Sequence, residues 1–114
     1  MMMEIYFDEE KCKEHNYDIN ERYQIIDKFF EDNHVKKIDK GVYLGTKDDF
    51  TVFNKANISL PRTKWFREII DKMYWRVEGL APAYREDCME AYYDSRKQFL
   101  EYAKKRHLNV EEVD

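Results

Sequence analysis

Glycine and proline are scarce in this sequence, with three glycines and two prolines among 114 residues. Because these residues dominate turns and linkers, their scarcity excludes long structureless loops and low-complexity segments. Hydrophobic residues make up 43% of the chain, which excludes intrinsic disorder although 39% of the residues are charged. The length fits one domain, and we expect residues 1–114 to form a single domain with a frayed tail at 109–114.

Cysteines and long apolar runs are also few. The N-terminal residues lack the basic start, apolar segment and cleavage site of a secretory signal, and we assign no role to Met1–Met3. We therefore expect a cytoplasmic protein in which Cys12 and Cys88 are free thiols. No apolar run approaches the roughly 20 residues that span a bilayer. We accordingly expect no membrane association.

Motifs for catalysis or metal binding are missing as well. The sequence contains no glycine-rich phosphate loop, no nucleophile elbow and no calcium loop. Cys12 and His15 have a spacing that suits zinc, but they supply two of the three or four ligands that a zinc site needs. Cys88 falls on an apolar helical stripe among acidic residues, which favours core packing over nucleophilic chemistry. We predict no metal, no cofactor and no enzymatic activity.

The charge is unevenly distributed. Residues 1–33 hold ten acids and four bases, a net charge of −6, whereas residues 34–79 hold ten bases and six acids, a net charge of +4. Residues 80–114 hold eight acids and six bases, a net charge of −2. The acidic total disfavours non-specific nucleic-acid binding, although the basic middle segment leaves that function open.

Hydrophobic spacing predicts the elements of the first half. A strand over Glu4–Phe7 and a short helical turn through His15 precede a helix over 19–32, for which Asp18 is the N-cap. Alternating residues over 35–46 indicate a β-hairpin, and Asp39-Lys40-Gly41 suggests a bulged connection more than a two-residue turn.

The second half reads as largely helical. Residues 48–60 could be strand or helix, and we favour a helix that ends at Pro61. Apolar residues at helical spacing predict a helix from Thr63 to Val77 that Gly79 stops, and a last helix from Pro82 to about His107. The predicted fold is α+β: a small antiparallel sheet, formed by the N-terminal strand and the hairpin, packed by three to four helices.

Three groups of side chains are candidate contact residues. Arginines surround the predicted 63–77 helix, and an exposed tryptophan beside arginine is typical of interface hot spots, although the same residue could equally cover the sheet. Acids spaced along the last helix could imitate a phosphate backbone, although ordinary solvated faces would look the same. A lysine-rich hairpin with Tyr43 could bind nucleic acid, but we favour protection of a sheet edge. The aromatic group is Trp65, Tyr74 and Trp75. The acidic group is Glu86, Asp87, Glu90 and Asp94. The lysine group is Lys36, Lys37, Lys40 and Lys47.

Short segments throughout residues 3–94 carry a resemblance. They are Ile5-Tyr6-Phe7-Asp8, Glu10-Lys11-Cys12, Gly41-Val42-Tyr43-Leu44-Gly45-Thr46, Leu60-Pro61-Arg62-Thr63-Lys64-Trp65-Phe66, Met73-Tyr74-Trp75 and Arg85-Glu86-Asp87-Cys88. In these the chain resembles small uncharacterised proteins of mobile elements and prophages in low-GC Gram-positive bacteria. The resemblance implies a genetic context that includes anti-CRISPR and other anti-defence proteins, and it implies no catalytic residue.

Together these features indicate a small acidic module that binds protein. Our first hypothesis is an inhibitor from a phage or mobile element that binds a host nucleic-acid-handling protein, most specifically a CRISPR effector nuclease. The alternative is a small nucleic-acid-binding regulator that uses the 36–47 hairpin. The aromatic residues, 16% of the chain, could also form a homodimer interface.

Overall fold

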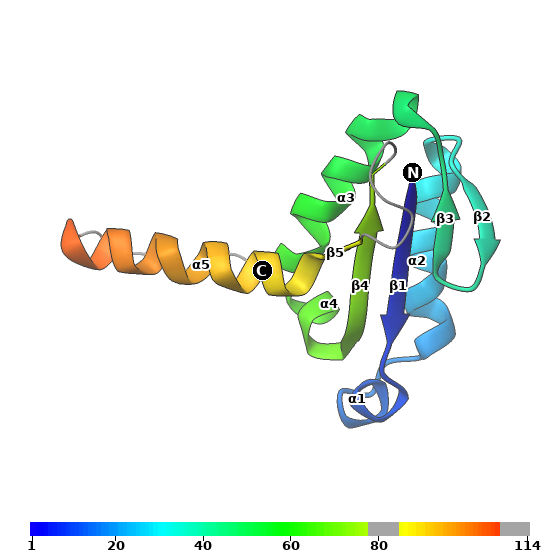
Figure 1. The fold of residues 1–114 in the computed structure, drawn as a ribbon. Helices are drawn as coiled ribbons and strands as arrows, with labels where there is room; N and C mark the ends of the chain where they lie inside the picture. The colour runs from blue at the N-terminus through cyan, green and yellow to red at the C-terminus, as the bar shows by residue number, and fades with distance from the viewer. Residues whose placement is uncertain (78–84, 108–114) are drawn as a thin grey trace.

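The computed structural model of the chain describes residues 1–77 and 85–107 (Figure 1). It has an α+β fold with five α-helices and one five-stranded antiparallel sheet, which confirms the predicted class. The elements in chain order are β1 (Met2–Phe7), α1 (Glu9–Glu14), α2 (Ile19–Asp32), β2 (Lys36–Asp39), β3 (Val42–Leu44), the short 3₁₀ helix η1 (Lys47–Asp49), α3 (Phe50–Arg62), α4 (Lys64–Ile69), β4 (Ile70–Arg76), β5 (Glu86–Asp87) and α5 (Cys88–Lys105).

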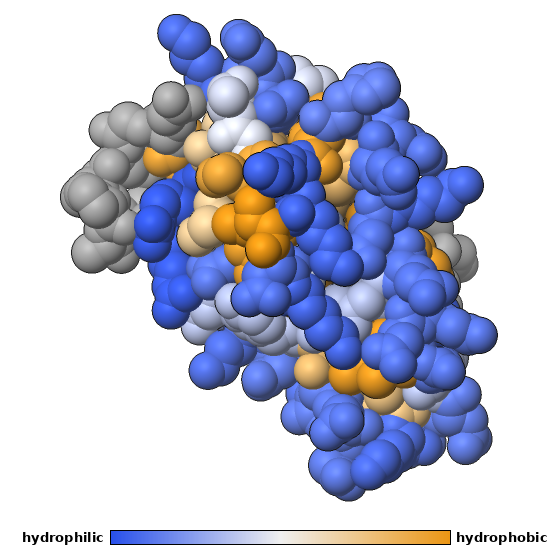
Figure 2. Space-filling view, turned by 90° about the vertical axis from the view of Figure 1, so that its right-hand side faces the viewer, coloured by the Kyte–Doolittle hydropathy of each residue, from blue (hydrophilic) through white to orange (hydrophobic). Residues whose placement is uncertain are grey.

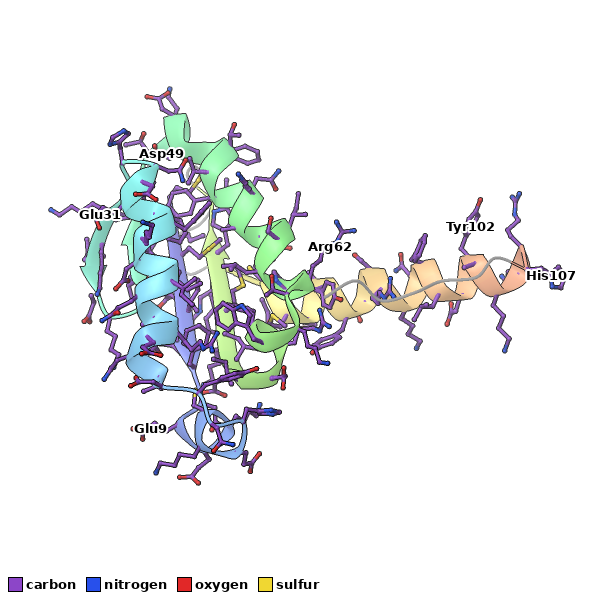
Figure 3. All side chains as sticks on the ribbon, turned by 180° about the vertical axis from the view of Figure 1, so that it is seen from behind. Glu9, Glu31, Asp49, Arg62, Tyr102 and His107 are labelled. Atoms are coloured by element: carbon purple, nitrogen blue, oxygen red, sulfur yellow. The ribbon has the colours of Figure 1, made fainter. Side chains whose placement is uncertain are left out.

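The sheet has the strand order β2-β3-β1-β4-β5, with β1 at its centre. The order of its first four strands is that of a split βαββαβ arrangement, to which β5 adds a short edge. Helices α2 and α3 lie on the same face of the sheet, as the views from the front and from behind both show (Figures 1 and 3). The core lies between these two helices and the sheet.

Strand β1 supplies alternate side chains to that core. Met3, Ile5 and Phe7 are buried, whereas Glu4 and Tyr6 between them face the other side of the sheet. The strand begins at Met2, two residues before the predicted start. Met3, which lies outside the predicted strand, is fully buried in the core.

Helix α2 has the bounds that its sequence predicts. The Asp18 side chain accepts hydrogen bonds from the Asn20 and Glu21 N–H groups, so it caps the helix as expected. Tyr23, Ile26 and Phe30 are buried on one face. The cap and the apolar stripe are both local features of the sequence, which explains why the prediction succeeded.

The predicted helix over 63–77 is wrong beyond Ile69. Helix α4 ends there, and residues 70–76 form β4, which pairs with β1 from Met2↔Arg76 to Phe7↔Ile70. The apolar spacing in this segment fits a helix and also lets Met73 and Trp75 share one face of a strand. Pairing with a strand from the other end of the chain decides between these structures.

The sheet is therefore wider than the predicted three strands. Glu86 and Asp87, which we expected at the start of the last helix, form β5 and pair with Trp75 and Tyr74 of β4. Asp87 also acts as the N-cap of α5, because its side chain accepts hydrogen bonds from the N–H groups of residues 89 and 90. Two backbone pairs thus fix the point from which α5 leaves the sheet.

The ambiguous segment 48–60 is helical, as we favoured. Helix α3 continues from η1, whose Thr46 and Asp49 form a reciprocal capping box. Pro61 does not end α3 but occupies its penultimate position, and the helix ends at Arg62. The predicted shared face is only partly buried, since Phe53 is in the core whereas Phe50 is 47% exposed.

The hairpin combines the two predicted alternatives. Lys40-Gly41 is a two-residue connection between β2 and β3, and a bulge follows Lys37 on β2. Gly41 has φ = 75°, and a Cβ atom there would overlap the Ile5 carbonyl oxygen. The position therefore needs glycine. The two backbones approach closely because the Gly41 carbonyl accepts a hydrogen bond from the Ile5 N–H at 2.7 Å, which joins the turn to β1.

Some predictions fall on residues that the structure does not describe. Gly79 as a helix stop, Pro82 as the start of the last helix and the frayed tail at 109–114 lie outside the described residues. Among the helices of residues 1–77 and 85–107, none combines the length and apolar character needed to cross a bilayer.

Candidate protein-interaction surface

Helix α5 extends away from the body of the protein (Figure 1). It packs mainly against α3, β4 and β5, and Cys88 and Met89 in its first turn are buried in the core. Arg62 lies at the base of the helix, whereas Tyr102 and His107 lie near its far end (Figure 3). A helix of 18 residues is about 27 Å long. Most of that length lies beyond the sheet.

An acidic stripe runs along one side of this helix. We define the α5 acidic stripe as Asp87, Glu90, Asp94 and Glu101, all of which are exposed. At 3.6 residues per turn, these four residues lie within about 60° around the helix axis. Three of them are predicted contact residues, and Glu101 is one that sequence reasoning missed.

The predicted acids nevertheless differ in role. Asp87 caps the helix, so its carboxylate already binds two backbone N–H groups. Glu86 is half-buried in β5 and borders the groove described below. Glu90 and Asp94 therefore remain as the predicted acids whose carboxylates have no such structural role in the described part of the chain.

Large apolar side chains occupy the other sides of α5. Tyr93 is 53% exposed, Phe99 48%, Leu100 41% and Tyr102 50%. Exposed aromatic residues on a projecting element are typical of protein interfaces. The sequence does place these aromatics on the last helix, but its periodicity alone predicts that they face a core.

A groove separates the base of α5 from α3. Its volume is about 470 Å³, and its lining combines apolar and charged groups. The lining residues are Asn57, Ile58, Arg62, Glu86, Cys88, Ala91, Tyr92, Ser95, Arg96 and Phe99. Burial, followed by the nearby charges of Glu86 and Asp87, raises the pKa of the Cys88 thiol to about 12. The thiol is therefore protonated at neutral pH and is poorly suited to nucleophilic catalysis.

The three predicted aromatic contact residues do not share a surface. Trp75 is only 4% exposed and lies on the core face of β4, so the alternative in which it covers the sheet is correct. Tyr74 lies on the opposite face of the same strand. Trp65 is on α4, where it packs near Phe7 and beneath the Arg22 guanidinium, 5.0 Å from its ring. The predicted single helix that would have joined them does not exist.

Tyr74 belongs to a polar cluster on the face of the sheet opposite to α2 and α3. The Arg85 guanidinium lies 3.9 Å from the Tyr74 ring and donates to Glu4 Oε2 at 3.0 Å. The Tyr6 hydroxyl donates to Glu4 Oε1 at 2.9 Å. Both oxygens of this carboxylate are satisfied within the fold, so the cluster joins the first strand to the segment before β5.

The lysines of the hairpin are partly engaged by α2. Lys37 pairs with Asp27 at 2.9 Å, and Lys40 donates to Asn20 at 3.2 Å. Tyr43 is fully buried and stacks on Phe30 with ring centroids 4.2 Å apart. It therefore cannot stack on a base, which the nucleic-acid alternative requires of it. Strand β2 forms one edge of the sheet, which agrees with edge protection by lysines.

Figure 2 shows the side of the molecule that carries this edge. Hydrophilic side chains dominate it, and apolar side chains gather in limited areas between them. Ile25 of α2 and Ile38 of β2 are two exposed apolar side chains of the elements near this edge. Lys36 and Lys47, the other two predicted lysines, are exposed as well.

Cys12 and His15 do not come together as a metal site. Cys12 is buried in the core, whereas His15 Nδ1 lies 2.6 Å from Glu68 Oε2. Over the described ranges, no group of three or more histidine, cysteine or acidic side chains is placed to hold a metal ion.

Comparison of the chain with protein-family models, with curated proteins and with solved structures finds no match. The surface that stands out is α5, because one helix combines an acidic stripe with exposed aromatic side chains and extends away from the core.

Proposed function

We propose that this protein is a non-enzymatic binding module that contacts another protein through α5. The observation that carries the proposal is the position of this helix, which extends away from the body and has aromatic side chains about half exposed (Figure 1). Burial of such side chains is the main source of affinity at protein interfaces. Because the chain encloses no site with converging catalytic groups among its described residues, binding fits the geometry better than chemistry does.

The partner that suits the acidic stripe is a protein that normally holds nucleic acid. Glu90 and Asp94 are about 6 Å apart along the axis, and Glu101 follows after about 10 Å. Such a row of carboxylates can occupy a basic groove meant for phosphates. In its most specific form, the proposal is an inhibitor from a mobile element that blocks a host CRISPR effector nuclease, in keeping with the resemblance of the sequence.

The test uses the tagged full chain as bait in a lysate of a Gram-positive bacterium, with and without nuclease treatment. We expect a stoichiometric protein that survives nuclease treatment and that added duplex DNA or RNA displaces. The variant Asp94→Lys with Glu101→Lys should weaken capture about tenfold or more. Both residues are exposed and neither caps the helix, so the fold should persist.

The matched control is Glu9→Lys with Glu31→Lys, which makes the same charge change on α1 and α2, away from α5 (Figure 3). We expect this control to bind as the wild type does. Equal loss in both variants would reduce the effect to net charge and overturn the role of the stripe. Recovery of nucleic acid in place of a protein, abolished by Lys36→Glu with Lys37→Glu, would instead support the alternative of a nucleic-acid-binding regulator. A captured nuclease should be inhibited in a cleavage assay by the wild type and not by the stripe variant.

A further inference from the structure

We propose that residues 108–114 of this chain turn back at the end of α5 and lie in the groove between α5 and α3. This placement differs from the frayed end that the sequence predicts for 109–114. Three features of the described residues lead to it: the way in which α5 ends, the burial of Ala103 and the charge of the groove. The proposal does not rest on the proposed function, because the position of the segment can be measured without any partner.

The first feature is the way in which α5 ends. His107 follows the C-cap Arg106, has φ = 55° and donates its N–H to the Lys104 carbonyl oxygen at 3.3 Å. A residue in this left-handed conformation directly after a helix is typical of the Schellman motif, which turns the chain back on the last turn of the helix. The next residue of that motif packs on the residue five positions before it. The motif therefore directs Leu108 onto Ala103.

The same motif ends α1 and α2, and there the returning residue is described. After α2, His34 has φ = 61°, and the N–H of the buried Val35 donates to the Phe30 carbonyl oxygen at 2.9 Å. After α1, the residue before Tyr17 also has a positive φ, and the Tyr17 N–H donates to the Cys12 carbonyl oxygen at 2.8 Å. In both cases an apolar or aromatic residue follows the residue with positive φ, and the sequence has the same order after α5.

The second feature is the burial of Ala103. This residue is 1% exposed, although it lies on the part of α5 that extends away from the body. No other described helix or strand lies beside that part in the views from the front and from behind (Figures 1 and 3). Its neighbours Phe99 and Tyr102 are about half exposed. A chain that returns over Ala103, as the motif requires of Leu108, accounts for this burial.

The third feature is the positive charge of the groove. Its lining includes the guanidinium groups of Arg62 and Arg96 and a single carboxylate, that of Glu86. A third guanidinium, that of Arg67, lies 5.9 Å from the ring of Tyr92, which also lines the groove. This charge contrasts with the net charge of −4 of the whole chain. Because arginine binds carboxylates with charge-assisted hydrogen bonds, the groove suits an acidic ligand.

The segment 108–114 matches the groove in charge and in reach. It contains three acids and no base. At about 3.3 Å per extended residue, it reaches about 23 Å back from His107. Because α5 rises about 1.5 Å per residue, Tyr92 lies about 22 Å back along the axis. Glu112, at about 17 Å, then comes level with Arg96.

The path from Ala103 to the groove lies on one side of α5. Ala103 and the groove residues Tyr92, Arg96 and Phe99 lie within about 60° around the helix axis. A chain that covers Ala103 on its return therefore continues into the groove. The α5 acidic stripe lies about 180° away around the axis. The acids of the segment are thus kept apart from the stripe, and they face arginines.

The test is paramagnetic relaxation in the full chain, with a nitroxide on the variant Val113→Cys. Cys12 and Cys88 are buried, so the label attaches selectively. We expect loss of the amide NMR signals of Asn57 and Ile58, which line the groove on α3, and no loss along α2.

Charge variants test what holds the segment. Arg62→Glu with Arg96→Glu should abolish the loss of the α3 signals, and Glu111→Arg with Glu112→Arg in the same chain should restore it. Arg62→Glu alone, at an exposed position, should reduce the loss if the double variant does not fold. The matched control is Lys28→Glu with Lys36→Glu, two exposed positions on α2 and β2, which should leave the loss unchanged. Circular dichroism checks that each variant is folded.

Three outcomes would overturn the proposal. Full α3 signals in the labelled chain would show that the segment does not lie in the groove. A loss that is insensitive to all the arginine variants would remove the charge match. Nitrogen-15 chains mixed with nitroxide-labelled chains of natural isotope content test the source of the segment. Loss of the α3 signals in that mixture would show that the groove binds the segment of a second copy.

Discussion

Tyr43 shows how a single buried hydroxyl is made compatible with the core. Its ring is fully buried against Phe30, and its hydroxyl donates to Asp27 Oδ1 at 2.6 Å. The other carboxylate oxygen of Asp27 accepts a hydrogen bond from Lys37 Nζ at 2.9 Å. Burial, reinforced by the hydrogen bond to the Asp27 carboxylate, raises the pKa of Tyr43 well above its usual value of 10. One carboxylate thereby joins the sheet, the hairpin and α2.

The pKa of Tyr43 predicts how stability depends on alkaline pH. In the unfolded chain the tyrosine ionises near pH 10, whereas in the folded protein it stays protonated. The folded state then binds more protons, so the free energy of unfolding is complete below about pH 10 and falls as the pH rises above it. Tyr43→Phe should cost about 1 to 2 kcal/mol at pH 7 and should flatten this decline. Urea unfolding at pH 7, 10 and 11 measures both effects, and Tyr102→Phe is the exposed control. Parallel pH curves for Tyr43→Phe and the wild type would contradict the assignment.

Among the elements, α5 begins at a residue with two structural roles. Asp87 caps the helix and also pairs with Tyr74 across β5 and β4. Asp87→Ala should lower the free energy of unfolding by about 1 kcal/mol, because two helix N–H groups lose their acceptor. Asp94→Ala, at an exposed position further along α5, should change it by less than about 0.5 kcal/mol. Equal losses from thermal or urea unfolding of the two variants would show that the cap contributes little.

The elements also show what the sequence could predict. Helix α2 was predicted with its bounds because its cap at Asp18 and its stripe are local. Strand β4 was mistaken for helix because the partner that defines it, β1, lies about seventy residues earlier in the chain. The same limit applies to the site. Glu90 and Asp94 were placed on the last helix, but the direction in which α5 leaves the body depends on β5, which a local pattern does not reveal.

For the whole molecule, the sheet and α5 should differ in local stability. Strand β1 is hydrogen-bonded on both sides, to β3 and β4, and its inner face is buried. The far half of α5, from Phe99 to Lys105, lies beyond the core and is mostly exposed. At low micromolar concentration, amide hydrogen exchange should be about a thousandfold or more slower in β1 than in that half of α5. Similar rates in the two segments would mean that α5 is held by contacts other than those described.

The central place of β1 has a consequence for synthesis on the ribosome. Of the strands in the sheet, β1 is synthesised first, yet its pairing with β4 needs Arg76, which is made 74 residues after Met2. At about 5 to 20 residues per second, the nascent chain waits about 4 to 15 seconds before the sheet can close. During that interval Met3, Ile5 and Phe7 lack part of the core that buries them in the complete fold. Ribosome-associated chaperones that bind apolar segments of nascent chains should therefore raise the yield of this protein, although they are not needed once it has folded.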